Sequence, residues 1–221
     1  MEVSILKETP DWLAINKPIN CSIHSEQGLG LVAELKHRLN LEFLAPVHRL
    51  DRVTSGVLLL AKNSQAAAQL SQQFADREVN KIYIALTEGK PNKKQGCIKG
   101  DMEPARSGNW MLTRKFSNPA ITYFYSLGYQ HGFRLALLKP VTGKTHQLRV
   151  AMKSNGSPIL GDTRYGKKDN VSDRCYLHHY RLTFDDQGQR HQIKAPLHNG
   201  IYFLEAELLT LIEEQLEKVG W

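Results

Sequence analysis

The stretch PVHRLDRVTSGVLLLAK, Pro46 to Lys62, places one carboxylate, Asp51, between two arginines and just before an apolar run. The run VLLLAK follows Gly56 and is short and aliphatic, which predicts a buried strand. Asp51 should therefore be held at the edge of that strand, where it needs partners because burying an unpaired charge is costly. For an isolated Arg-x-Asp triplet, the alternative is a structural ion pair that closes a turn. The short motif by itself leaves both interpretations open.

The pattern of helices and strands along the chain indicates an α+β fold. Apolar and polar residues alternate around a Thr-Pro-Asp turn, which predicts a hairpin over residues 3–15. Helices are predicted from Leu31, where leucines recur at helical spacing, and from Ser64, which can cap a helix ending near Arg77. Further strands are predicted at residues 81–89, 120–129, 133–141, 175–184 and 193–197. Because the two types do not alternate strictly, we expect a mixed, largely antiparallel sheet with flanking helices.

The composition is that of a soluble globular protein, with 41% apolar and 23% charged residues in 221. This length can bury a core as one compact unit, with two packed lobes as the alternative. Lys and Arg outnumber Asp and Glu by 29 to 22, which gives a net charge of +7. Such a charge suits a polyanionic partner but does not identify one.

Cysteine usage and the N-terminus point to a reducing compartment. The three cysteines, Cys21, Cys97 and Cys175, form no C-x-x-C pair, so neither a disulfide framework nor a zinc site is indicated. The N-terminus has charges every few residues and no apolar signal region, and nowhere do about eighteen apolar residues run together. We therefore expect a cytoplasmic protein.

Several motifs in a fixed order resemble those of the RluA-type pseudouridine synthases. In chain order they are HRLDRVTSGVLLLAK, KIYIAL, KPVTGKTHQLRV and GSPILGDTRYG, and WLAINKP and AITYFYSL also match. The resemblance covers nearly the entire chain. It implies a pseudouridine synthase fold, a single catalytic domain over residues 1–221, and isomerisation of uridine in RNA to pseudouridine without metal or cofactor.

By this resemblance Asp51 is the catalytic aspartate. The reaction detaches uracil from C1′ of the ribose, rotates it and rejoins it through carbon-5. An ionised carboxylate can attack an electron-poor centre or take a proton from C2′, so covalent and acid–base routes both use this residue. A model aspartate with a pKa of about 3.9 is ionised at neutral pH, and a neighbouring arginine keeps it so.

The resemblance also assigns residues around that carboxylate. Arg149 lies in a predicted helix, with Thr145 as a candidate N-cap and Gly156 as the C′ residue, and the family match places its guanidinium against the aspartate. Leu148 matches an apolar residue that packs near the target base, although ordinary core packing is compatible with that role. Tyr83 matches a tyrosine that stacks on the base and can assist proton removal from carbon-5. A core aromatic is the structural alternative.

A stacked uridine must be extruded from the RNA before this chemistry, at a cost of a few kcal/mol. By resemblance Arg49 enters the vacated space or steadies the flipped nucleotide, because its plane can stack on bases while its donors reach phosphates. His48 lies beside it, and a hydrogen-bonded structural histidine is the alternative for that residue. Arg52 is a further candidate for substrate contact, although neighbours on an extended chain point to opposite faces.

The sequence departs from the family in two places: Ile19-Asn20-Cys21 in a loop after Lys17-Pro18, and His198 in the C-terminal element IKAPLHNG, where relatives often carry proline. We also expect no N-terminal RNA-binding domain, since none fits before Val3. The polar, basic segment 90–118 is predicted to be a surface excursion, and its Lys93 and Lys94 are candidate RNA contacts. The expected partner is transfer or ribosomal RNA, and the expected state is a monomer with no metal and no membrane association.

Two other classes of function stay open. The first is an RNA-binding or folding factor that keeps the fold with little activity, which loss of Asp51, Tyr83 or Arg149 would indicate; all three are present. The second is a glycoside hydrolase, which usually needs two carboxylates beside the scissile bond. No second acid accompanies Asp51 in the matched motifs, and Asp162 is predicted to brace a turn.

Overall fold

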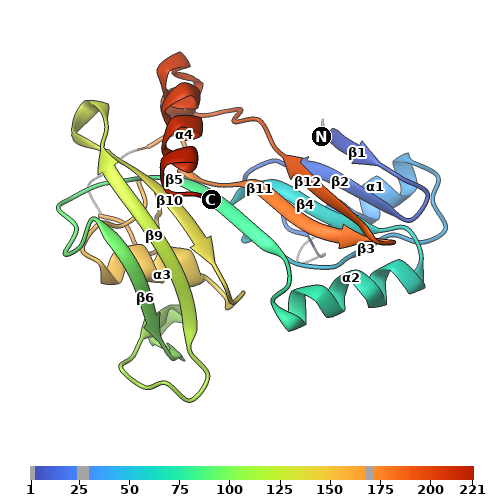
Figure 1. Ribbon diagram of the computed structural model, residues 1–221, viewed down its shortest axis with the longest axis horizontal. Helices are drawn as coiled ribbons and strands as arrows, with labels where there is room; N and C mark the ends of the chain where they lie inside the picture. The colour runs from blue at the N-terminus through green and yellow to red at the C-terminus, as the bar shows by residue number, and fades with distance from the viewer. Residues whose placement is uncertain (1–2, 24–29, 168–171) are drawn as a thin grey trace. The chain divides into compact units, whose positions relative to one another are not determined.

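The structure is a computed structural model that describes residues 3–23, 30–167 and 172–221. The chain folds into two compact units (Figure 1). Unit 1 contains Met1–Lys81 and His179–Pro196, and unit 2 contains Ile82–His178 and Leu197–Trp221. Each unit is built from two segments, so the chain passes three times from one unit to the other. The single catalytic domain over residues 1–221 stays a prediction.

The sheet of unit 1 is built on two fully buried strands, β2 (Trp12–Lys17) and β4 (Ser55–Ala61). They pair antiparallel, from Trp12 opposite Ala61 to Lys17 opposite Gly56. β1 (Ser4–Glu8) pairs with β2, and the short β3 (Ala45–Pro46) pairs with β4. β11 (Leu177–Asp186) neighbours β4 and pairs with β12 (Gln189–Lys194). The predicted N-terminal hairpin and the buried strand after Gly56 are confirmed.

The helices α1 (Leu31–Arg38) and α2 (Ser64–Asp76) belong to unit 1. α2 buries Ala66 and Leu70 in a core cluster that also contains Trp12 and Phe184. The predicted cap at Ser64 is wrong, because the preceding Asn63 has an extended backbone and its Oδ1 accepts the Ala66 N–H at 2.8 Å. The predicted end of the helix is confirmed at Arg77, which adopts the left-handed conformation.

The main sheet of unit 2 has the order β5-β10-β9-β6. Its strands are β5 (Asn80–Thr87), β10 (Arg134–Pro140), β9 (Ala120–Gly128) and β6 (Gln95–Gly100), all paired antiparallel. β9 and β10 form the predicted hairpin, joined by a 3₁₀ turn at Gln130–Gly132. A separate hairpin joins β7 (Met102–Pro104) and β8 (Trp110–Leu112) across a second 3₁₀ turn, Arg106–Gly108.

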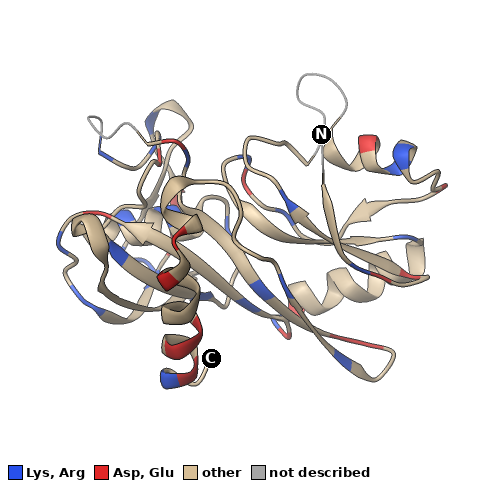
Figure 2. Cartoon of the chain, turned by 90° about the horizontal axis from the view of Figure 1, so that it is seen from above, with Lys and Arg blue, Asp and Glu red and all other residues tan. Residues whose placement is uncertain are grey.

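Two α-helices lie in unit 2, α3 (Gln147–Ser154) and α4 (Ala206–Lys218), and a 3₁₀ turn at Ile201–Leu204 precedes α4. α4 is a helix that was not predicted from the sequence. Leu208, Ile212 and Leu216 recur every fourth residue and are buried, which is the spacing that could have identified the helix. The opposite side of α4 carries glutamates, which show as red bands in Figure 2.

The segment 90–118 is largely exposed, as predicted, but it also contains β6, β7 and β8. These strands escaped prediction because few of their side chains are buried, which leaves no apolar alternation to detect. With antiparallel pairs in both units and helices beside them, the α+β class is confirmed. No helix in the described part of the chain is long and apolar enough to cross a membrane.

Candidate active site

Asp51 lies in the turn that joins β3 to β4 in unit 1. Its backbone carbonyl accepts the Thr54 N–H at 3.0 Å, and its side chain is half-buried. At Gly56, with φ +113°, an added Cβ would lie 2.3 Å from the His179 carbonyl oxygen, so the backbones meet too closely there for any side chain. The HRLDRVTSG motif therefore places Asp51 at the edge of a buried strand, as its sequence predicts.

A buried lysine that is not among the predicted site residues holds this turn in place. The Nζ atom of Lys17, at the end of β2, donates to the carbonyls of Pro18 and Thr54 at 2.8 Å each and of Arg52 at 3.3 Å. Lys17 is 0% exposed, so its charge is solvated by these carbonyl dipoles in place of water. The signal lies in WLAINKP, where the charged Lys17 ends a buried strand that is apolar except for Asn16.

His48 packs into unit 1. Its Nε2 accepts the Leu59 N–H at 3.0 Å, and its ring stacks on Phe74 with centroids 4.7 Å apart. Burial, with the charge of Lys81 second, lowers the pKa of His48 to about 3. The imidazole is therefore neutral near pH 7, and these contacts are those expected of a structural histidine.

The two arginines beside Asp51 are exposed. Arg49 presents its side chain to solvent, and Arg52 donates from Nε to the Asn20 carbonyl at 3.3 Å. Both guanidinium groups are therefore available on the surface of unit 1, as contact with a phosphate or an unstacked base requires.

Tyr83 lies in the middle of β5, opposite Leu138 of β10, and is 8% exposed. Its neighbours Ile82 and Ile84 point to the other face of the strand and are buried as well. Tyr83 thus sits on a rigid strand of unit 2, which holds its ring in one place.

Arg149 is buried on α3 and has a carboxylate partner in unit 2. Its Nε and Nη2 donate to the two carboxylate oxygens of Asp162, both at 2.8 Å. Burial raises the pKa of Asp162, but the hydrogen bonds and charge of Arg149 outweigh it, with help from the N–H groups of Arg164 and Tyr165, so the net pKa lies below its ordinary value. Asp162 braces a turn, as predicted, and also holds Arg149, which was not predicted.

The N-terminus of α3 differs from the prediction. The helix begins at Gln147 with His146 as its N-cap, so the assignment of Thr145 is wrong. His146 has φ 56°, and its Nδ1 lies 2.8 Å from the hydroxyl of Tyr165, a residue distant in the sequence, while its side chain makes no capping hydrogen bond. Gly156 is the residue after the C-cap and has φ +77°, as predicted.

The remaining predicted residues also lie in unit 2. Leu148 precedes Arg149 on α3 and is 7% exposed. Lys93 and Lys94 are exposed in the loop before β6. The structure therefore brings His48, Arg49, Asp51 and Arg52 together on one loop of unit 1, and the other predicted residues belong to unit 2.

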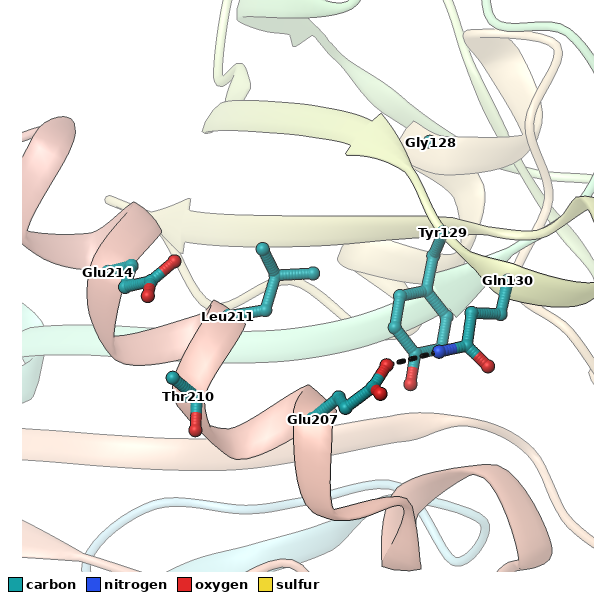
Figure 3. Close-up of a pocket in the computed structure, with 7 residues that line it drawn as sticks. All are labelled: Gly128, Tyr129, Gln130, Glu207, Thr210, Leu211 and Glu214. Atoms are coloured by element: carbon teal, nitrogen blue, oxygen red, sulfur yellow. Dashed lines mark hydrogen bonds between the residues drawn. The ribbon is translucent and has the colours of Figure 1, made fainter.

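Unit 2 also contains an acidic pocket of about 520 Å³, lined by Gly128, Tyr129, Gln130, Glu207, Thr210, Leu211 and Glu214 (Figure 3). Gln130 donates to Glu207 of α4 at 2.5 Å. The Tyr129 hydroxyl donates to Glu205, and burial together with this carboxylate raises the pKa of Tyr129. The carboxylates of Glu207 and Glu214 in the pocket wall repel phosphate, so this pocket does not suit an RNA strand.

In residues 3–23, 30–167 and 172–221, no group of three or more His, Cys, Asp or Glu side chains is arranged to hold a metal ion.

Comparison with known proteins identifies the family. The family profile described as RNA pseudouridylate synthase matches residues 11–154. A protein of Haemophilus influenzae named uncharacterized RNA pseudouridine synthase is 44% identical over 219 residues, which cover 99% of this chain and 98% of that protein.

Relatives named for different RNAs are also similar. Ribosomal large subunit pseudouridine synthase D of Borreliella burgdorferi is 35% identical, over 83% of this chain and 61% of that protein. tRNA pseudouridine synthase C of Haemophilus ducreyi is 36% identical, over 75% of each chain. The solved structure of human RNA pseudouridylate synthase domain containing 1 has a TM-score of 0.75 at 26% identity, and covers 96% of this chain and 94% of its own. The chain belongs to the RNA pseudouridylate synthase family.

Proposed function

We propose that this chain isomerises a specific uridine in transfer or ribosomal RNA to pseudouridine, with Asp51 as the catalytic carboxylate. Family membership makes the chain an isomerase that converts uridine to pseudouridine. The observation that carries the assignment of Asp51 is its place in the HRLDRVTSG turn, within the matched residues 11–154 and fastened at the edge of β4.

The proposed chemistry needs one well-placed carboxylate. In the overall reaction the C1′–N1 bond of uridine breaks, a C1′–C5 bond forms, carbon-5 loses its proton and N1 gains one. Asp51 either attacks a sugar or base carbon or removes the C2′ proton, and both routes return the carboxylate unchanged. The bonds from Lys17 to the backbone of this turn support the proposal, because they preorganise the carboxylate before substrate binds.

The other matched residues are proposed to serve the same reaction. Tyr83 stacks on the target base and assists loss of the carbon-5 proton, and Leu148 provides apolar contact. Arg149 is proposed to stabilise the ionised form of Asp51. Its pair with Asp162 supports a role that needs a rigid guanidinium, since two parallel hydrogen bonds fix its plane.

Access to the uridine is proposed to occur by base flipping. Arg49 is proposed to occupy the vacated space, with Arg52 and His48 beside it, and Lys93 and Lys94 are proposed to contact RNA elsewhere. The exposure of both arginines in unit 1 supports their part in this scheme. The relatives are named for ribosomal and for transfer RNA, so either class is a candidate substrate.

The proposal is tested by tritium release from RNA labelled at uridine carbon-5. Total transfer RNA and ribosomal RNA from a strain lacking the protein are incubated with wild type and with Asp51→Asn, each at equal concentration. Release by wild type that is lost in Asp51→Asn supports the assignment and names the substrate class. Release that survives in Asp51→Asn contradicts the role of Asp51, and no release from either pool, with RNA bound, favours a binding factor.

A further inference from the structure

A basic pocket of about 610 Å³ lies in unit 2 at the start of β6. It is lined by Lys93, Lys94, Gln95, Tyr125, Ser126, Leu127, Gly128 and Arg134. Three of these side chains are cationic and none is acidic, in contrast to the acidic pocket that shares Gly128. A concave surface with three cations and no carboxylate in its wall concentrates positive potential, which favours an anion.

The backbone that carries the two lysines is anchored at both residues. Lys93 donates its N–H to Oδ1 of the buried Asn155 at 3.1 Å, and its carbonyl accepts from the Asn155 Nδ2 at 2.9 Å. The Lys94 carbonyl accepts the N–H of Ser126 at 2.6 Å and its hydroxyl at 3.1 Å. The lysines are therefore exposed side chains on a fixed loop, which lowers the entropic cost of binding an anion between them.

Arg134 contributes a guanidinium with unused donors. Its Nη2 donates to the Ser126 carbonyl at 3.0 Å. Its Nε is buried and has no hydrogen-bond partner in the part of the chain that the structure describes. A guanidinium has five N–H donors, so Arg134 has more donors than the protein acceptors around it satisfy. Buried donors in proteins are normally paired, so the protein alone leaves this guanidinium incompletely satisfied, and its remaining Nη donors are open to an acceptor from outside the chain.

We propose that Lys93, Lys94 and Arg134 form a binding site for a backbone phosphate of the RNA substrate. This inference rests on the proposed function, and it adds Arg134 and a phosphate group as ligand to the lysine surface proposed from sequence. Arginine binds phosphate through paired N–H donors, while lysine supplies a point charge. Arg134 would therefore orient the phosphate, and the two lysines would add positive charge. The half-buried Tyr125 in the wall offers an aromatic face beside the phosphate, as in other proteins that hold single-stranded nucleic acid.

The site contributes to the affinity for RNA and to the position of the RNA on the protein. It does not recognise a particular base, because contacts to phosphate carry no direct sequence information. Each phosphate contact releases counterions, so the logarithm of the binding constant falls linearly with the logarithm of salt concentration. Losing one such contact reduces that slope by about one. The difference in this slope between wild type and a pocket variant therefore measures the phosphate contact that the pocket makes.

The test measures binding of unfractionated transfer RNA and of ribosomal RNA at several KCl concentrations. The variants are Lys93→Gln/Lys94→Gln, which changes exposed residues only, and Arg134→Gln, checked for folding by thermal unfolding. The control Lys36→Gln/Lys218→Gln removes the same charge at exposed helix positions outside the pocket. Tritium release by each protein is recorded in parallel.

Because the three cations serve one phosphate, we expect the lysine pair and Arg134→Gln each to lower the slope by about one, the lysine pair to lower affinity roughly tenfold, and the control to match wild type. A wild-type slope in both pocket variants overturns the site. An equal loss in the control also overturns it, because net charge would then explain the effect. If wild type releases no tritium, the proposed function fails, and the slopes still decide whether this pocket binds RNA phosphate.

Discussion

Asp162 and Asp51 lie in two family motifs but in different settings. Asp162 is 3% exposed, and its two oxygens hold Arg149 and the N–H groups of Arg164 and Tyr165. Asp51 is half-buried on a turn that Lys17 fastens through backbone carbonyls. One carboxylate side chain thus holds the fold together itself, whereas the other is displayed by a turn whose backbone is held by other groups. Substitutions should therefore separate stability from catalysis.

Replacing Asp51 with Asn should give the largest effect. The Thr54 N–H still bonds to the backbone of residue 51, and Lys17 still bonds to residues 18, 52 and 54, so the turn keeps these contacts. We expect loss of pseudouridine formation by about a thousandfold or more, with little change in RNA affinity, which resides mainly in phosphate contacts. Tritium release and filter binding measure the two quantities. Activity within tenfold of wild type would contradict the assignment of Asp51 as the catalytic carboxylate.

Replacing Asp162 with Asn should act first on stability. It removes the negative charge that Nε and Nη2 of the buried Arg149 contact at residue 162, and breaking a buried pair costs about 3–5 kcal/mol. Urea unfolding measures the change in free energy of unfolding. The matched control is Glu103→Gln, which breaks the exposed ion pair with Lys115 and should have no measurable effect. Equal stability of the Asp162→Asn protein and wild type would show that this pair does not hold unit 2.

Lys17 is the cation on which the Asp51 turn depends. Lys17→Met keeps the volume but leaves the carbonyls of Pro18, Arg52 and Thr54 without this donor, and we expect a loss of about 2–3 kcal/mol. Because the turn displays Asp51, kcat should fall more than KM rises, measured below the unfolding transition. A stable variant with normal kcat would contradict this dependence.

The sequence predicts best those features that depend on neighbouring residues. The strand after Gly56, the end of α2 at Arg77 and the hairpin of β9 and β10 follow from local patterns, and all three are confirmed. Asn63 and Ser64 are both good caps, so sequence alone does not choose between them. β6 is held by backbone pairing to β9 and buries little, so its side chains carry no signal.

The same distinction applies to the candidate site. The place of Asp51 beside a buried strand follows from one contiguous motif. The bonds from Lys17 to Arg52 and Thr54 join residues 35 and 37 positions apart, and Arg149 meets Asp162 across 13 positions. Such contacts depend on tertiary packing, for which a single sequence offers no periodicity or cap to detect. The basic pocket around Arg134 could not be predicted from the sequence for the same reason.

The smallest expected effect is the pH dependence of stability, which differs between the loop that carries Asp51 and the Arg149–Asp162 pair. His48, on the Asp51 loop, has its pKa lowered to about 3 by burial and by Lys81, against 6.5 ordinarily. The unfolded chain therefore binds a proton that the folded chain does not between those values, so stability falls as pH drops from about 6.5. Asp162, whose pKa is also lowered, loses its contribution only as pH falls below its ordinary value of 3.8.

Urea unfolding at pH 7 and pH 5 measures the His48 contribution without disturbing Asp162. Wild type should lose about 2 kcal/mol more than His48→Gln over this interval, because one pKa unit corresponds to about 1.4 kcal/mol. Gln offers an oxygen for the Leu59 N–H but does not titrate, so other histidines cancel in the difference. If both proteins lose the same stability, His48 is protonated in the folded state, and the loop that carries Asp51 is more open to solvent than its contacts with Leu59 and Phe74 indicate.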